Sequence, residues 1–227
     1  MEKCEMQPYP LHMSEKCCIL SDMKAMQRIR EHLQALAPGE PFTPKSLLEW
    51  GPRSAVDQAL SRLTTQGLVR RVGRGLYARP LWSEWSGEAV PVVLERALEV
   101  KTRALGEVIA PHGAVAVNRF GLSSQLPLRA VFLTTGRSRS LNIEGREVKL
   151  IHTSARSLPL GGSRPGLALT AMRYLGIGQL EPAHVRRIRE QLSLEEWATV
   201  KSALSGQPAW LIETIQRSEG HYAPELF

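Results

Sequence analysis

The chain has 227 residues, of which 43% are hydrophobic, and a formal net charge of +7, so it can form one large domain or two ordinary ones around a hydrophobic core. It lacks the run of about 18 apolar residues that a transmembrane helix requires, and its first residues lack the apolar region and cleavage site of a secretory signal. We therefore expect a cytoplasmic protein with no membrane partner.

Residues 1–23 are predicted to be a flexible leader. All three cysteines of the chain lie in it, namely Cys4, Cys17 and Cys18. An adjacent pair within an odd total is typical neither of a disulfide framework nor of a metal site, so free thiols are expected. Met13 and Met23 are alternative starts within this segment.

Positive charge is concentrated in residues 24–80. This segment carries ten lysines and arginines against four acidic residues, and it therefore holds most of the net charge. Clustered basic charge favours a polyanionic partner such as a nucleic acid. The alternative is that these basic residues only make the surface soluble.

The first half of this segment predicts two helices. In "MQRIREHLQAL" the apolar residues share one face of an amphipathic helix, and they are Ile29, Leu33 and Leu36. The following "PG" ends this helix. In "FTPKSLLEW" Thr43 is a natural N-cap and Pro44 suits the first helical position, so a second, short helix is expected up to about Trp50.

A third helix is predicted to open at Ser54, with Asp57 at the spacing of a capping box. Its apolar stripe consists of Val56, Leu60 and Leu63. Gly67 is well placed as the glycine that follows the helix. Two short apolar stretches, 68–72 and 76–78, surround the turn "GRG" and predict a hairpin.

Three helices followed by a hairpin are the element order of a winged helix-turn-helix. A recognition helix enters the DNA major groove, while basic side chains contact phosphates and fix its register. We expect Ser54, Gln58 and Arg62 to read bases, because glutamine pairs with adenine and arginine with guanine. The predicted DNA-binding residues are Thr43, Lys45, Arg53, Ser54, Gln58, Ser61, Arg62, Arg70, Arg71 and Arg74. The alternative is a three-helix unit whose polar face is only hydrated.

Residues 81–227 are predicted to form a separate α+β domain. Trp82 and Trp85 are expected to pack against a neighbouring domain, and "PVVLERALEVKTRALGEVI" predicts a helix, whereas "GAVAVNRFGLSSQLP" is ambiguous between helix and strand. "RAVFLTTG" predicts a buried strand and "SLNIEGREVKLIHT" a second hairpin. Four helices are then expected, over 167–175, 182–192, 193–204 and 208–217.

Catalytic motifs are missing from residues 81–227. The histidines there are dispersed without metal-ligand spacing, "GLSSQ" is not a nucleophile elbow, and "LPLGGSRPG" has no phosphate-binding lysine. No aspartate follows Asp57, although acidic ligands carry two-metal chemistry. We expect no enzyme activity, no cofactor and no metal. "HVRRIREQL" could form a second basic patch, but its apolar positions favour a solvated outer helix face.

The stretch "FTPKSLLEWGPRSAVDQALSRLTTQGLVRRVGRGLYARP", followed about forty residues later by "GAVAVNRFGLSSQLPLRAVFLTTGRSRSLNIEGREVKLIHT", resembles the AbiEi-like antitoxins of bacterial type IV toxin–antitoxin systems. The resemblance runs from about Met26 to Trp210. It implies a winged helix that binds operator repeats and represses the antitoxin–toxin operon, with DNA contacts on the helix from Ser54 to Gln66. It also implies a C-terminal antitoxin domain and a nucleotidyltransferase-like toxin as partner.

The sequence therefore predicts an α+β protein with a leader (1–23), a winged helix-turn-helix domain (24–80) and a mixed α+β interaction domain whose C-terminal part is helical (81–227). The expected function is a DNA-binding transcriptional autorepressor that acts as the antitoxin of a nucleotidyltransferase-like toxin. The alternatives are a protein-binding winged-helix scaffold and a transcriptional regulator without a toxin partner. An enzyme that acts on nucleic acid is the least favoured hypothesis.

Overall fold

The computed structural model describes residues 26–125 and 127–220. This part of the chain mixes helices and strands, as predicted, and the chain divides into two compact units, Met1–Ala104 and Leu105–Phe227. The expected boundary lay after Pro80. Residues 81–104 instead belong to the first unit.

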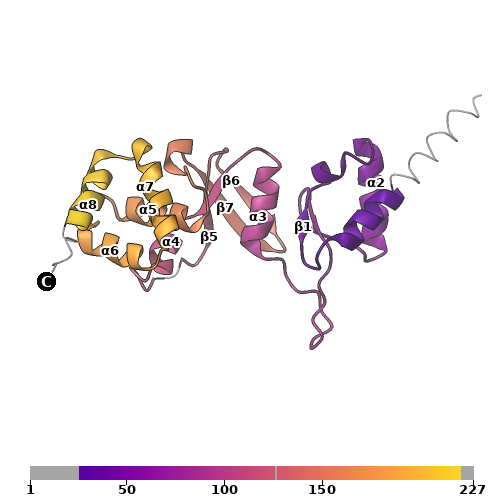
Figure 1. Cartoon of the computed structure of the whole chain (residues 1–227). Helices are drawn as coiled ribbons and strands as arrows, with labels where there is room; N and C mark the ends of the chain where they lie inside the picture. Colours follow the sequence, from indigo (N-terminus) through magenta and orange to yellow (C-terminus); the bar gives the residue numbers. More distant parts are fainter. Residues whose placement is uncertain (1–25, 126, 221–227) are drawn as a thin grey trace, which may run out of the picture. The chain divides into compact units, whose positions relative to one another are not determined.

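The described part of the first unit consists of four helical segments, the last of which is α3, and three short strands (Figure 1). Strand β3 pairs antiparallel with both β1 and β2, which gives the strand order β1-β3-β2. In chain order the elements are a helix over 26–35, β1 (Pro41–Phe42), the 3-10 helix η1 (Pro44–Leu47), α2 (Arg53–Thr65), β2 (Arg70–Gly73), β3 (Leu76–Ala78) and α3 (Leu94–Arg103).

The core of the first unit confirms the apolar faces predicted from the sequence. The first helix contributes Ile29 and Leu33, and α2 contributes its whole stripe. The buried core residues are Ile29, Leu33, Phe42, Leu47, Val56, Ala59, Leu60, Leu63 and Val69. Because α2 is anchored on one side only, its opposite side is left to solvent.

The second predicted helix is shorter and tighter than expected. It is the four-residue 3-10 helix η1 rather than an α-helix that reaches Trp50. Only six residues separate Pro44 from the dipeptide Gly51-Pro52. Because Pro52 disfavours the α conformation at the residue before it, the chain has little room for a longer helix. Thr43 occupies the N-cap position and Pro44 the first helical position, as predicted, but the Thr43 side chain forms no capping hydrogen bond.

The ends of α2 differ in how well they were predicted. The helix begins at Arg53, with Pro52 in the N-cap position and no side-chain cap, so the capping box from Ser54 to Asp57 is not formed. Asp57 instead accepts hydrogen bonds from Arg53 one turn before it, at 2.8 and 2.9 Å. At the other end Gly67 has φ +71° and its N–H donates to the Thr64 carbonyl, which is the expected glycine-terminated helix end.

Residues 81–90 form a narrow loop that extends away from the helices and strands of the first unit (Figure 1). Trp82 and Ala89 form a β-bridge across it, and the Val90 N–H donates to the Leu81 carbonyl at 2.7 Å. Trp85, near its tip, is 100% exposed, and Trp82 is 58% exposed. The expected packing of these two tryptophans is therefore wrong.

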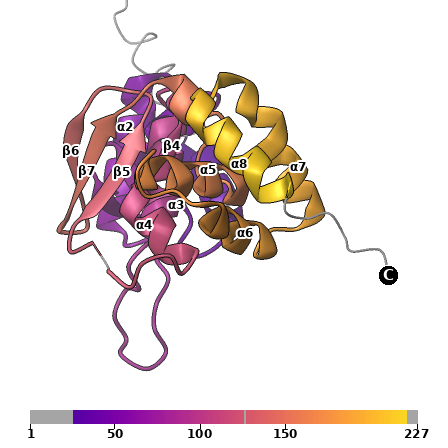
Figure 2. The same ribbon diagram turned by 90° about the vertical axis from the view of Figure 1, so that its left-hand side faces the viewer.

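The strands of the second unit are adjacent in the order β6-β7-β5-β4. Strands β5 and β7 are parallel, whereas the β4–β5 and β6–β7 pairs are antiparallel. Helices α5–α8 gather to one side of these strands (Figure 2). The elements are β4 (Ile109–Pro111), α4 (Gly113–Arg119), β5 (Ala130–Thr134), β6 (Arg139–Ile143), β7 (Arg146–His152), η2 (Ala155–Ser157), α5 (Arg164–Leu175), α6 (Pro182–Glu190), α7 (Leu194–Ser202), η3 (Ala203–Gly206) and α8 (Ala209–Gly220).

Most sequence predictions for the second unit are confirmed. The β6–β7 hairpin turns at Glu144 and Gly145, both with positive φ, and the four C-terminal helices form close to their expected ranges. The ambiguous segment forms helix α4. Helix α5 supplies the centre of the core, with eight consecutive buried residues from Pro165 to Met172.

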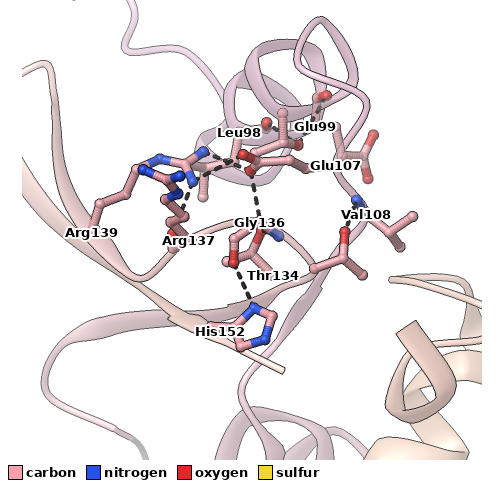
Figure 3. A network of polar contacts seen from close by, with 11 residues as sticks. Leu98, Glu99, Glu107, Val108, Thr134, Gly136, Arg137, Arg139 and His152 are labelled. Carbon is pink, nitrogen blue, oxygen red and sulfur yellow. Dashed lines mark hydrogen bonds and ion pairs between the residues drawn. The ribbon is translucent and has the colours of Figure 1, made fainter. Parts of the chain in front are cut away.

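A polar network fixes the loops at the ends of β5 and β7 (Figure 3). The Glu107 carboxylate accepts hydrogen bonds from both terminal nitrogens of Arg139, at 3.1 and 2.7 Å, and from the Thr134 hydroxyl at 3.2 Å. The Nδ1 atom of His152 lies 2.8 Å from the Gly136 carbonyl oxygen. We interpret this network as structural, because its charged groups are paired with each other.

The expected leader, residues 1–23, and with it the three cysteines, lies outside the described residues. In the described part of the chain, no helix combines the length and apolar character needed to cross a membrane. The same residues contain no cluster of three or more histidine, cysteine, aspartate or glutamate side chains that could hold a metal ion.

Candidate nucleic-acid interface

Helix α2 presents a polar face opposite its buried stripe. Residues four and seven positions apart return to the same side of an α-helix, so the positions that follow Ser54 at these spacings align with it. The exposed residues of this face are Ser54, Gln58, Ser61 and Arg62, with Arg53 and Asp57 beside them. The sequence thus placed both faces of this helix correctly.

The short side chains on this face are available for a ligand. Among the described residues, the side chains of Ser54, Gln58 and Ser61 form no hydrogen bond, and the backbone carbonyl of Ser61 accepts one from the Thr65 hydroxyl. Arg62 makes only a long contact of 3.9 Å to the Met26 sulfur. Arg53 forms an exposed ion pair with Asp57 at 2.8 Å, and such surface pairs contribute little and exchange readily with other partners.

The β2–β3 hairpin adds exposed arginines near the end of α2. Arg71 lies on β2 and Arg74 in the turn between the strands, and both are exposed. The Arg71 Nε donates a long hydrogen bond of 3.4 Å to the Gly73 carbonyl. The Arg74 carbonyl accepts a hydrogen bond from the Lys101 ammonium group, which ties the turn to α3 and leaves the guanidinium of Arg74 outside.

Lys45 is exposed on η1, and its ammonium group donates to the Ala104 carbonyl at 2.8 Å. It borders a pocket of about 470 Å³ that is also lined by Phe42, Val100 and Arg103. Arg103 is an exposed basic residue that was not predicted to be part of the site. Nothing in the sequence indicated that Arg103 lies beside Lys45, because the helix that carries Arg103 was assigned to the other domain.

Two predicted DNA-binding residues do not belong to the exposed set. Thr43 is buried, and its carbonyl accepts a hydrogen bond from the Ser46 hydroxyl at 2.8 Å. Arg70 is half-buried and its Nη2 donates to the Val90 carbonyl at 2.6 Å. Its side chain therefore fastens the hairpin to the end of the 81–90 loop and is not directed at a surface ligand.

The remaining eight predicted residues are exposed in the first unit, on η1, on α2 and on the hairpin: Lys45, Arg53, Ser54, Gln58, Ser61, Arg62, Arg71 and Arg74. All eight side chains can donate hydrogen bonds to phosphate or to base edges, and five of them carry positive charge. The arrangement combines a helix face of short polar side chains with arginines at its margins, which is the chemistry of a nucleic-acid interface.

A protein-family model matches most of the chain. The model of a family described as "Family of unknown function (DUF6088)" matches residues 28–200. No curated protein matches the sequence. The matched region begins in the first helix, includes the whole candidate interface and reaches into α7. The chain therefore belongs to the DUF6088 family.

Proposed function

We propose that the first unit is a winged helix-turn-helix that binds double-stranded DNA in a sequence-specific way, with α2 as the recognition helix. One observation supports this above all: α2 is anchored by a buried stripe and leaves Ser54, Gln58, Ser61 and Arg62 exposed on the opposite face. The antiparallel β1-β3-β2 strands and the β2–β3 hairpin have the order that a wing requires.

The exposed residues divide into two roles in this proposal. Gln58 and Arg62 contact base edges, because the glutamine amide can form two hydrogen bonds with adenine and the arginine guanidinium can form two with guanine. Arg71 and Arg74 contact phosphates from the wing, and Lys45 contacts a phosphate from η1. Arg53 exchanges its partner Asp57 for phosphate when DNA binds, since their ion pair is exposed.

The test measures binding of the full chain to the DNA segment upstream of its own gene and to a shuffled duplex of equal composition. Fluorescence anisotropy at several salt concentrations gives both affinities. We expect tighter binding to the upstream segment, and an affinity for both duplexes that falls with salt as phosphate contacts release counterions. Equal, weak binding to both duplexes that disappears at moderate salt would refute sequence-specific recognition.

We further propose that the chain represses its own operon and acts as the antitoxin of a nucleotidyltransferase-like toxin. This part rests on the resemblance to AbiEi-like antitoxins. A nucleotidyltransferase-like gene directly downstream, whose expression stops growth unless this chain is co-expressed, is the expected result. If the adjacent gene product leaves growth unaffected, the chain is a regulator without a toxin partner.

The 81–90 loop favours a second candidate function, docking of a partner protein. A fully exposed tryptophan near the tip of a loop held by its own β-bridge is the type of residue that dominates binding energy at protein interfaces. If this loop binds the adjacent gene product, Trp85→Ala weakens that complex by about tenfold or more and leaves DNA affinity unchanged. An unchanged complex would exclude the loop as the docking site.

A further inference from the structure

The second unit contains a pocket of about 200 Å³ that the DNA-binding proposal does not use. It is lined by His112, Leu133, Thr153, Ser157, Arg173 and Tyr174, among others. Leu133 lies in β5 and Thr153 directly follows β7, and these two strands are parallel, with Thr134 paired to His152 at their ends. Carboxyl ends of parallel strands are the usual place for ligands in sheets covered by helices.

Arg173 is the charged group of this pocket. Its side chain is half-buried, and its Nη1 donates to the Gln207 side-chain oxygen at 2.9 Å while its Nη2 donates to the Ser157 hydroxyl at 3.1 Å. Both acceptors are neutral, and among the described residues no carboxylate forms an ion pair with it. A partly buried guanidinium is normally compensated by an anion.

The two neutral acceptors also hold the guanidinium in one orientation. Gln207 is itself buried and its amide nitrogen donates to the Arg156 carbonyl at 3.1 Å. A guanidinium has five N–H donors, so the two contacts leave others for a ligand. Such a fixed, planar set of donors is suited to oxyanions, which it can bind through two parallel hydrogen bonds.

His112 supplies a second, oriented donor. Its Nδ1 accepts a hydrogen bond from the Ala114 N–H at 3.4 Å, so the proton of the neutral ring is on Nε2. The ring lies edge-on to Tyr174, with 5.3 Å between the ring centroids. Burial lowers the pKa of His112, which favours the neutral ring while the pocket is free.

We propose that this pocket binds a small tetrahedral oxyanion of the phosphate type, either free or as the terminal group of a phosphate monoester. Arg173 provides the charge, and His112 donates from another element, with the hydroxyls of Thr153 and Ser157 beside them. Donors from several directions match the three or four oxygens of such an anion better than the two oxygens of a carboxylate. This inference does not depend on DNA binding by the first unit.

The experiment titrates the full chain with inorganic phosphate at constant ionic strength and follows the NMR signals of the His112 ring. We expect saturable shifts of these signals, and none with the same ionic strength of chloride. A parallel titration with glycerol phosphate identifies the source: tighter binding indicates a phosphorylated small molecule, and equal binding indicates free phosphate.

Two arginine variants make the test specific. Arg173→Gln should weaken phosphate binding by about tenfold or more, the usual loss for charge-assisted hydrogen bonds. Arg156→Gln removes the same charge from an exposed position in η2 that does not line the pocket, and it should change the affinity by less than about twofold. His112→Asn, read out by backbone amide signals, should also weaken binding, because asparagine can retain the cap of α4 but lacks the ring N–H.

Absence of saturable binding to the folded wild-type chain would overturn the proposal. Equal losses in Arg173→Gln and Arg156→Gln would overturn it too, because they would show attraction by general positive potential. Unfolding curves of each variant establish that it is folded, and if Arg173→Gln is unfolded, His112→Asn and Arg156→Gln decide the outcome.

Discussion

Arg70 and Arg71 are neighbours in sequence but differ in environment. The Arg70 guanidinium donates to the Val90 carbonyl, whereas the Arg71 side chain is exposed. A period of two along a strand sends adjacent side chains to opposite faces. The predicted order of elements and the clustered charge assigned both arginines to phosphate contacts, and only the fold separates them.

This difference predicts opposite results for two matched variants. Arg70→Ala should lower the free energy of unfolding by about 1–3 kcal/mol, because the half-buried Val90 carbonyl loses its donor. Arg71→Ala should change stability by less than about 0.5 kcal/mol but lower DNA affinity. Urea unfolding and anisotropy on both variants check this. A stable Arg70→Ala variant with weakened DNA binding would restore Arg70 to the interface.

His112 should make the stability of the second unit depend on pH. Burial lowers its pKa in the folded chain below the ordinary value of 6.5, so the unfolded chain binds this proton more readily. Its contribution to stability is present above pH about 6.5 and is lost as the pH falls below that value. We expect His112→Asn to show a smaller loss of stability than the wild type between pH 7.5 and pH 5.5. Parallel losses in thermal melts of both proteins would contradict this origin.

At the scale of elements, Gly166 allows the first turn of α5 to lie against the preceding loop. A Cβ atom added there would meet the Gly161 carbonyl oxygen below contact distance and the Leu160 carbonyl oxygen at 2.9 Å. Both atoms belong to the backbone, so no side chain can move aside. Helix α5 also supplies much of the core of the second unit.

Gly166→Ala should therefore destabilise the chain by about 1–3 kcal/mol, the range for overpacked sites. Gly178 is the matched control, since a Cβ atom there would meet nothing within 4 Å and its φ is not positive. Gly178→Ala should shift stability by less than about 0.5 kcal/mol. Denaturant unfolding of the two variants measures the difference, and equal stabilities would show that the loop before α5 can yield.

The amphipathic elements were the most predictable part of the fold. Helix α2 and both hairpins could be predicted from the spacing of their apolar residues and from glycines at their ends or turns. Gly67 follows the end of α2, and Gly145 lies in the turn of the β6–β7 hairpin. These signals are local, so one sequence suffices to read them. The start of α2 was predicted one residue too late, at Ser54, because the sequence suggested a capping box there, whereas Pro52 occupies the N-cap position and Asp57 pairs with Arg53.

Features that depend on distant parts of the chain could not be predicted. Burial of Thr43 and the contact of Arg70 with Val90 arise only when separate segments pack together. The oxyanion pocket combines His112, Ser157 and Arg173, which are up to 61 positions apart in the sequence and form no motif. The catalytic motifs sought in the sequence have fixed local spacing, and for this reason the search passed over the pocket.

For the whole molecule, the central claim is that the exposed polar face of α2 recognises the base sequence, while the β2–β3 hairpin contacts phosphates. The most direct measurement is the ratio of affinities for the upstream and shuffled duplexes, with its salt dependence, in two double variants. Gln58→Ala with Arg62→Ala should bring the ratio close to one. Arg71→Ala with Arg74→Ala should weaken binding to both duplexes alike and reduce the slope of log affinity against log salt by about two. A ratio unchanged by the first double variant would contradict the account.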